Sequence, residues 1–183
     1  MRDKVLFAML IAELQALRVP RGLPDALYAT LYQPTQQGRP EGVTIWMHKS
    51  GDKRYGSRTT NQVPGPGPTG MLRREVQTME STIRFSVTQP PAIEDSDLTH
   101  ADVLKAIASA AQCPDFIDAL RAYNASVLRV TEIANTPYIN DTGQWEEGPM
   151  FSLVVRHLDI FIAGQPQIDA FEARVLSVPN LAA

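Results

Sequence analysis

The residues with the clearest chemical potential in this chain are a histidine and an aspartate on one predicted strand, His157 and Asp159. Side chains two residues apart on a strand point to the same face, so this carboxylate could orient the imidazole for general-base catalysis. No serine or cysteine in a nucleophile-elbow setting accompanies the pair. The sequence therefore favours a polar cluster at a sheet edge or subunit contact, and it predicts that the protein is not an enzyme.

Two other patterns resemble catalytic or cofactor motifs. Glu146 and Glu147 could form an acid pair, but adjacent strand residues point to opposite faces, so they are expected to decorate a rim. The segment 65–70 matches the glycine pattern of a dinucleotide-binding turn, yet its prolines remove the backbone amides through which that turn works. We predict no cofactor.

Metal-binding and disulfide chemistry are not indicated either. The three histidines, His48, His100 and His157, lie far apart in sequence and show no metal-ligand spacing. The single cysteine, Cys113, cannot form an intramolecular bridge and is expected to be a small, partly buried apolar residue. The predicted sites therefore include no metal and no catalytic residue.

Size and composition favour one domain spanning residues 1–183. The chain is 44% hydrophobic, which is enough for an ordinary core. A formal charge of −3 gives no overall attraction to nucleic acid, although a local basic patch is compatible with it. No segment approaches the roughly 20 apolar residues of a membrane span, so no membrane partner is expected.

Hydrophobic periodicity predicts an α+β fold with a mainly antiparallel sheet, an N-terminal helix and two short helices packed on one face. Leucines at helical spacing predict the first helix over residues 3–18, ended by Pro20. Thr99 with Asp102, and then Pro114, mark the starts of the two short helices. Strands are expected at residues 27–32, 43–48, 79–88, 127–134 and 144–163, with a turn at 136–143. Residues 168–178 suit either a helix or a strand, and we predict a strand for their second part, from residue 174.

Residues 49–74 are predicted to form a long loop or arm, because the proline- and glycine-rich run at 63–70 cannot hold a ladder or a helix. Long loops inside compact domains are usually functional or disordered until bound. This one could reach an acidic partner surface or phosphates, or it could be a solvated loop. Its candidate contact residues are the basic side chains Lys53, Arg54, Arg58, Arg73 and Arg74.

The strand at residues 151–162 is apolar on both faces. Leu153, Val155 and Phe161 fall on one side, and the other side carries Val154, Leu158, Ile160 and Ile162. A chain of this size can cover one face with its own helices, so we expect another copy or another protein to cover the second. This pattern favours assembly over catalysis.

Three segments resemble the tail-terminator or neck proteins of tailed bacteriophages, which cap the tail tube and meet the head-to-tail connector. They are the strand at 75–87, the helix beginning Thr99-His-Ala-Asp102 and the segment 145–159. Arg156 and Asp159 stand where that family has an Arg-x-x-Asp-like segment. The resemblance covers residues 27–178 and rests on the order of elements.

The resemblance implies a structural virion protein that forms a homohexameric ring, caps the tail tube and joins it to the head. Its expected partners are further copies of itself, the tail tube protein and the head-tail connector protein, with the tail sheath as a further candidate. DNA would pass through the lumen without sequence-specific binding. The protein would be assembled in the host cytoplasm and reside in the virion neck. The expected interface residues are those of the basic segment together with Arg156, Leu158, Asp159 and Ile160.

Two alternatives remain open at this stage. The chain could be another tail tube or baseplate component of similar fold. It could also be a small enzyme that uses His157 and Asp159.

Overall fold

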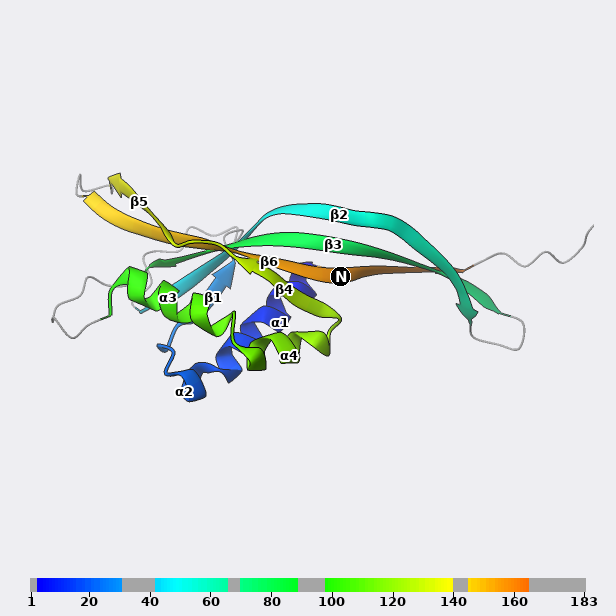
Figure 1. The fold of residues 1–183 in the computed structure, drawn as a ribbon, viewed down its shortest axis with the longest axis horizontal. Coiled ribbons are helices and arrows are strands. Elements are labelled where there is room, and N and C mark those ends of the chain that lie inside the picture. The colour runs from blue at the N-terminus through cyan, green and yellow to red at the C-terminus, as the bar shows by residue number, and fades with distance from the viewer. Residues whose placement is uncertain (1–2, 31–41, 66–69, 89–97, 140–144, 165–183) are drawn as a thin grey trace, which may run out of the picture.

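A computed structural model describes residues 3–30, 42–65, 70–88, 98–139 and 145–164 (Figure 1). Within these ranges, helices cover one face of a six-stranded sheet, which we term the inner face. The helices are α1 (Asp3–Ala16), α2 (Arg18–Arg21), α3 (His100–Ala110) and α4 (Pro114–Arg121). The strands are β1 (Leu27–Thr30), β2 (Thr44–Pro64), β3 (Met71–Thr88), β4 (Ala125–Val130), β5 (Ala134–Ile139) and β6 (Trp145–Gly164).

The strand order is β1-β2-β3-β6-β4, and β5 also pairs with β6. Only the pairing of β1 with β2 is parallel among the described strands, and every other pairing is antiparallel. The predicted α+β class with a mainly antiparallel sheet and an N-terminal helix is confirmed.

The core lies between the helices and the inner face of the central strands. Phe85 on β3 and Phe151 on β6 are directly paired in register, and their rings stack with centroids 4.9 Å apart. Leu10 and Leu14 of α1 are fully buried, as are Phe116 and other apolar residues of the short helices. Burial of these large side chains is the main force that holds the helices on the sheet.

The helix starts agree with the sequence signals. Thr99 accepts a hydrogen bond from the Asp102 amide, and the Asp102 carboxylate accepts one from the Thr99 amide, so a complete capping box opens α3. Pro114 takes the first turn of α4, and the Cys113 thiol caps that helix. The first helix ends at Ala16 rather than at residue 18, and Pro20 lies within the short α2.

The prediction of an irregular loop at residues 49–74 is wrong. Strand β2 runs to Pro64 and β3 begins at Met71, so most of this segment is a long antiparallel hairpin. The sequence did not predict this part of β2 because residues 50–62 are exposed on both faces and therefore show no apolar alternation. The proline- and glycine-rich run interrupts the strand pairing only between Pro64 and Met71, at the end of the hairpin. There the Gly65 amide donates a hydrogen bond to the Gly70 carbonyl at 2.8 Å.

The predicted turn at residues 136–143 is also wrong for its first part. Residues 134–139 form β5, which pairs with residues 145–150 of β6. Its Pro137 is tolerated because, among the described strands, β5 has a single neighbour, β6, and so lies at an edge. The ambiguous segment 168–178 lies outside the described residues.

Candidate functional site: a three-stranded arm

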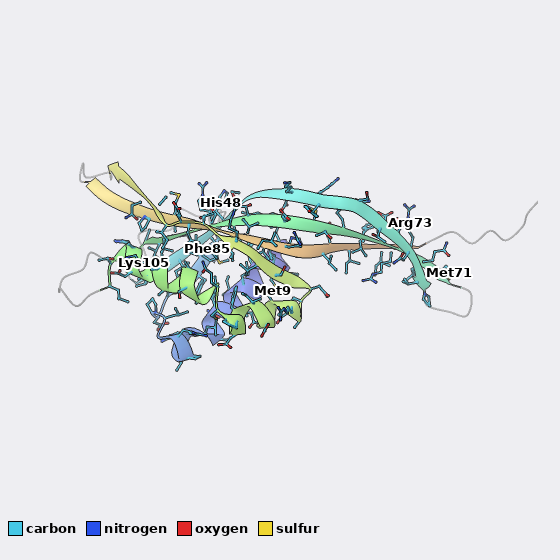
Figure 2. All side chains as sticks on the ribbon, in the orientation of Figure 1. Met9, His48, Met71, Arg73, Phe85 and Lys105 are labelled. Atoms are coloured by element: carbon cyan, nitrogen blue, oxygen red, sulfur yellow. The ribbon has the colours of Figure 1, made fainter. Side chains whose placement is uncertain are left out.

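The long strands β2, β3 and β6 continue past the helices as an arm (Figure 1). We define the arm as residues 50–64 of β2, 71–81 of β3 and 156–164 of β6. Figure 2 shows Met71 and Arg73 towards its far end, whereas Met9 and Phe85 lie in the helix-covered body. The arm forms because β3 pairs continuously with β6 from Leu72 to Ser86 without a register shift.

All nine predicted interface residues lie on this arm, but on two faces. Directly paired residues share a face, so the register assigns each side chain. The outer face carries Lys53, Arg74, Arg156, Leu158 and Ile160. The inner face carries Arg54, Arg73 and Asp159, together with Arg58, which bonds the inner-face Glu75.

On the outer face, one cluster connects all three strands of the arm. The Arg156 Nη2 atom donates to the Glu80 Oε1 atom at 3.1 Å. The same guanidinium lies 5.1 Å from the centre of the Tyr55 ring, which is the geometry of a cation–π contact. Sequence reasoning found Arg156 but missed Tyr55 and Glu80, since neither carries a motif and only the register brings them together.

The Arg-x-x-Asp pattern does not form a unit. Arg156 lies on the outer face, whereas Asp159 lies on the inner face, because an odd spacing along a strand places side chains on opposite sides. Asp159 and His157 do share the inner face, as their spacing of two predicts.

On the inner face, two of the predicted basic residues bind a buried carboxylate. The Glu75 carboxylate forms ion pairs with Arg58 (Nη1 to Oε2, 2.5 Å) and with Arg73 (Nη2 to Oε1, 2.7 Å). Only 9% of Glu75 is exposed. Such charge-assisted hydrogen bonds satisfy a carboxylate that would be costly to bury alone. These two arginines therefore help to hold the arm together.

At the base of the arm, a polar network connects three strands with the start of α1. His157 Nε2 lies 2.9 Å from the Ser81 hydroxyl, which donates to Asp52 Oδ1 at 2.6 Å. Lys49 bridges Asp52 and the α1 residue Asp3, the latter at 2.6 Å. The network anchors the arm to the helical body.

Burial and charge determine the protonation of this network. Burial lowers the pKa of His157, so the ring is neutral at neutral pH. Burial alone would raise the pKa of Asp52, but hydrogen bonds from Lys49 and Ser81 outweigh it and hold this pKa below its ordinary value. The carboxylate bonds the serine rather than the imidazole, and Ser81 is fully buried, so the arrangement differs from a catalytic triad.

In the far part of the arm, no described strand covers either outer edge of the sheet, and we call these the open edges. Strand β1 pairs only with residues 44–47 of β2, and no described strand pairs with that side of β2 beyond Met47. Strand β4 pairs with β6 only between Leu153 and His157, and no described strand pairs with that edge from Ile160 onwards. Open strand edges present backbone donors and acceptors that another chain can pair with.

The end of β6 combines an open edge with exposed apolar side chains. Ile160, Phe161 and Ile162 are 41%, 62% and 54% exposed. In contrast, Leu153, Val154 and Val155 in the body are buried within the chain, and Leu158 is half-buried. The apolar character of both faces, which the sequence predicts along the whole strand, is therefore left uncovered only at its far end among the described residues.

The other candidate sites have simple structural roles. Gly65 and Gly70 face each other across the hairpin end, and a strand rather than a helix follows Gly70, so the dinucleotide-like pattern lacks its required context. The backbones of Glu146 and Glu147 lie in β6 opposite β5. The described residues contain no group of three metal-ligating side chains. They also contain no helix long and apolar enough to cross a membrane.

Among the described residues, the fold is an α+β body covered by helices on one face, with a long arm whose edges no described strand covers and whose end is apolar. Strand edges and apolar patches of this kind are surfaces with which other proteins can pair. A family model described as "E217 gateway protein gp29" matches residues 4–164. The chain therefore belongs to the family of this phage gateway protein, and the predicted membership of a phage tail-terminator or neck family is confirmed.

Among solved structures, the chain is similar to the sheath/tube terminator of an extracellular contractile injection system, PVC, determined by cryo-EM in the extended state. The sequence identity is 11% and the TM-score is 0.43. The match covers 100% of this chain, which spans 66% of the length of that chain. A search of curated proteins gives no match.

Proposed function

We propose that the protein forms a homohexameric ring that caps the phage tail tube and joins it to the head-tail connector. The observation that carries this proposal is the arm, with two edges that no described strand covers and the exposed residues Ile160, Phe161 and Ile162. An exposed, regular and apolar strand edge is an aggregation hazard for an isolated subunit, and contact with neighbouring copies removes that hazard.

The remaining partners follow from the same proposal. The ring stacks on the tail tube protein on one side, and it presents a docking face to the connector on the other, with the tail sheath as a further neighbour. Assembly takes place in the host cytoplasm, and the finished ring resides in the virion neck. DNA passes through the lumen without sequence-specific binding. Pairing of Arg58 and Arg73 with Glu75 supports this, because it reduces the basic charge left to contact phosphates.

Imaging of the assembled particle tests the proposal. Negative-stain microscopy of purified tails with labelled protein is expected to show the label as a ring at the neck end of the tube. Light scattering of the purified protein at high concentration is expected to show a species larger than a monomer. A label at the distal tip would instead identify a baseplate component. A strict monomer together with tails that lack any ring would refute the proposal.

A further inference from the structure

The two open edges of the arm differ in shape and chemistry. The β6 edge is regular, since its register with β3 shows no shift, and its segment 160–164 contains no charged residue. The β2 edge contains register shifts between Lys49 and Gly51 and between Tyr55 and Thr59. It is also basic, with Lys53, Arg54 and Arg58 all exposed. Two such basic edges would repel each other, so the β2 edge is unsuited to pairing with the β2 edge of another copy.

We propose that the β6 edge of one copy pairs with the β2 edge of the next copy, so that the arms join into one continuous sheet around the ring. This inference rests on the proposed ring and specifies its subunit contact. The two edges lie on opposite sides of the same three-stranded sheet, because β3 occupies the centre. A contact between two different surfaces of the same chain is heterologous, and such contacts close into rings.

The chain direction determines the orientation of this contact. Both β2 and β6 pair antiparallel with β3, so both run from the body towards the end of the arm. Neighbouring copies in a six-fold ring are related by a rotation of about 60°, which cannot reverse a strand. The contact between β6 and the neighbouring β2 is therefore parallel, although each arm is antiparallel internally.

Side-chain chemistry favours this contact over pairing of β6 with itself. The end of β6 from Ile160 onwards is apolar and carries no positive charge, so it would meet the exposed basic β2 edge of the neighbouring copy without charge repulsion. An arginine of that edge packed over the exposed Phe161 ring would add a cation–π contact. A two-fold β6 pair would instead be antiparallel and would leave both basic β2 edges uncovered.

The face assignment makes the proposal testable by disulfide trapping. Ile160 lies in the same row of the sheet as Val76 and Thr59, and all three belong to the outer face. Thr60 is the next residue of the same exposed edge, but it belongs to the inner face, because it pairs with Glu75. Side chains on opposite faces cannot approach the distance that a disulfide requires.

The experiment uses the full chain with Cys113→Ser, which keeps a good cap on α4. The variant Ile160→Cys is combined with Tyr55→Cys, Thr59→Cys or Asn61→Cys, all on the outer face. The three positions test different offsets of the β2 strand of one copy along the β6 strand of its neighbour. The matched control combines Ile160→Cys with Thr60→Cys. After oxidation, the proposal predicts covalent oligomers up to the full ring in at least one outer-face pair, and none above the single-cysteine background in the control.

The outcomes separate this inference from the proposed function. Rings in the microscope with no crosslink in any outer-face pair would overturn the inference and leave the ring intact. A covalent dimer of the single variant Ile160→Cys would also overturn it, since that product reports β6 pairing with itself. Failure to form any ring, on tails or in solution, would overturn both.

Discussion

At the scale of single residues, the feature that most affects the arm is the polar link at its base. Ser81 connects His157 with Asp52, and Lys49 extends the link to Asp3 on α1. Ser81 and His157 are buried and lose water on folding, which their hydrogen bonds compensate, whereas Asp52 and Asp3 stay partly exposed. The link therefore contributes both to stability and to the position of the arm relative to the body.

Removing the central hydroxyl tests this link. We expect Ser81→Ala to lower the free energy of unfolding by about 1–3 kcal/mol, because a buried ring nitrogen and a carboxylate lose their shared partner. Urea denaturation monitored by circular dichroism measures the change. The control is Ser109→Ala on the exposed face of α3, which should change stability by less than about 0.5 kcal/mol. Equal effects of the two substitutions would contradict the role of Ser81.

The pKa of His157 adds a pH dependence. Because burial lowers this pKa in the folded state, the unfolded chain binds the proton more readily, and stability is lost as the pH falls below about 6.5. The loss is at most about 1.4 kcal/mol per pH unit for one group. We expect His157→Gln to be less stable at pH 7.5 but to show a flatter dependence between pH 7 and 5. Parallel melting curves for both proteins across this range would count against a neutral buried His157.

At the scale of elements, the outer part of the hairpin of β2 and β3 is expected to serve contacts with neighbouring proteins rather than folding of the subunit. Its outer part makes no contribution to the buried apolar core, which lies under the helices. Its end is closed by the hydrogen bond between Gly65 and Gly70. Changes at the hairpin end are therefore expected to affect neighbouring proteins rather than the fold.

A short deletion tests this separation. Removing residues 64–68 should leave the melting temperature within a few degrees of the wild-type value, because the described core lies under the helices. The same deletion should weaken joining of tails to heads in a complementation assay. The control is Gly22→Pro in the body, which should lower the melting temperature because Gly22 has a left-handed φ of 61° that proline cannot adopt. An unfolded deletion variant would show that the hairpin end is structural.

At the scale of the whole molecule, assembly depends on the end of β6. Ile160→Arg places a charge in the proposed dry contact and is expected to abolish ring formation while the subunit stays folded, since Ile160 is exposed in the subunit. Leu158→Arg should also disrupt assembly, but Leu158 is half-buried and the variant tests folding at the same time. Sizing by light scattering and circular dichroism separate the two effects. The matched control is Val19→Arg on α2, where the side chain is 87% exposed and away from the arm.

The amino-acid sequence by itself determined the elements that have one buried face. Two helices and one strand are predicted by the capping signals at Thr99 and Pro114 and by the apolar alternation at residues 79–88. These signals can be recognised because capping hydrogen bonds and burial of one face depend on residues that are close together in sequence. The apolar pattern of β6 likewise predicts a strand that needs a partner. The order of elements was enough to indicate the family.

Only the tertiary structure decided which residues form the arm and how they are divided between its faces. Residues 50–62 carry no buried face, so their strand exists through pairing with β3 rather than through any local pattern. Contacts such as Arg156 with Tyr55, or His157 with Ser81, join residues far apart in the chain, and the register alone brings them together. A shift of the register by one residue would exchange the two faces. Sequence spacing could therefore indicate candidate interface residues, but it could not assign those on different strands to a common face.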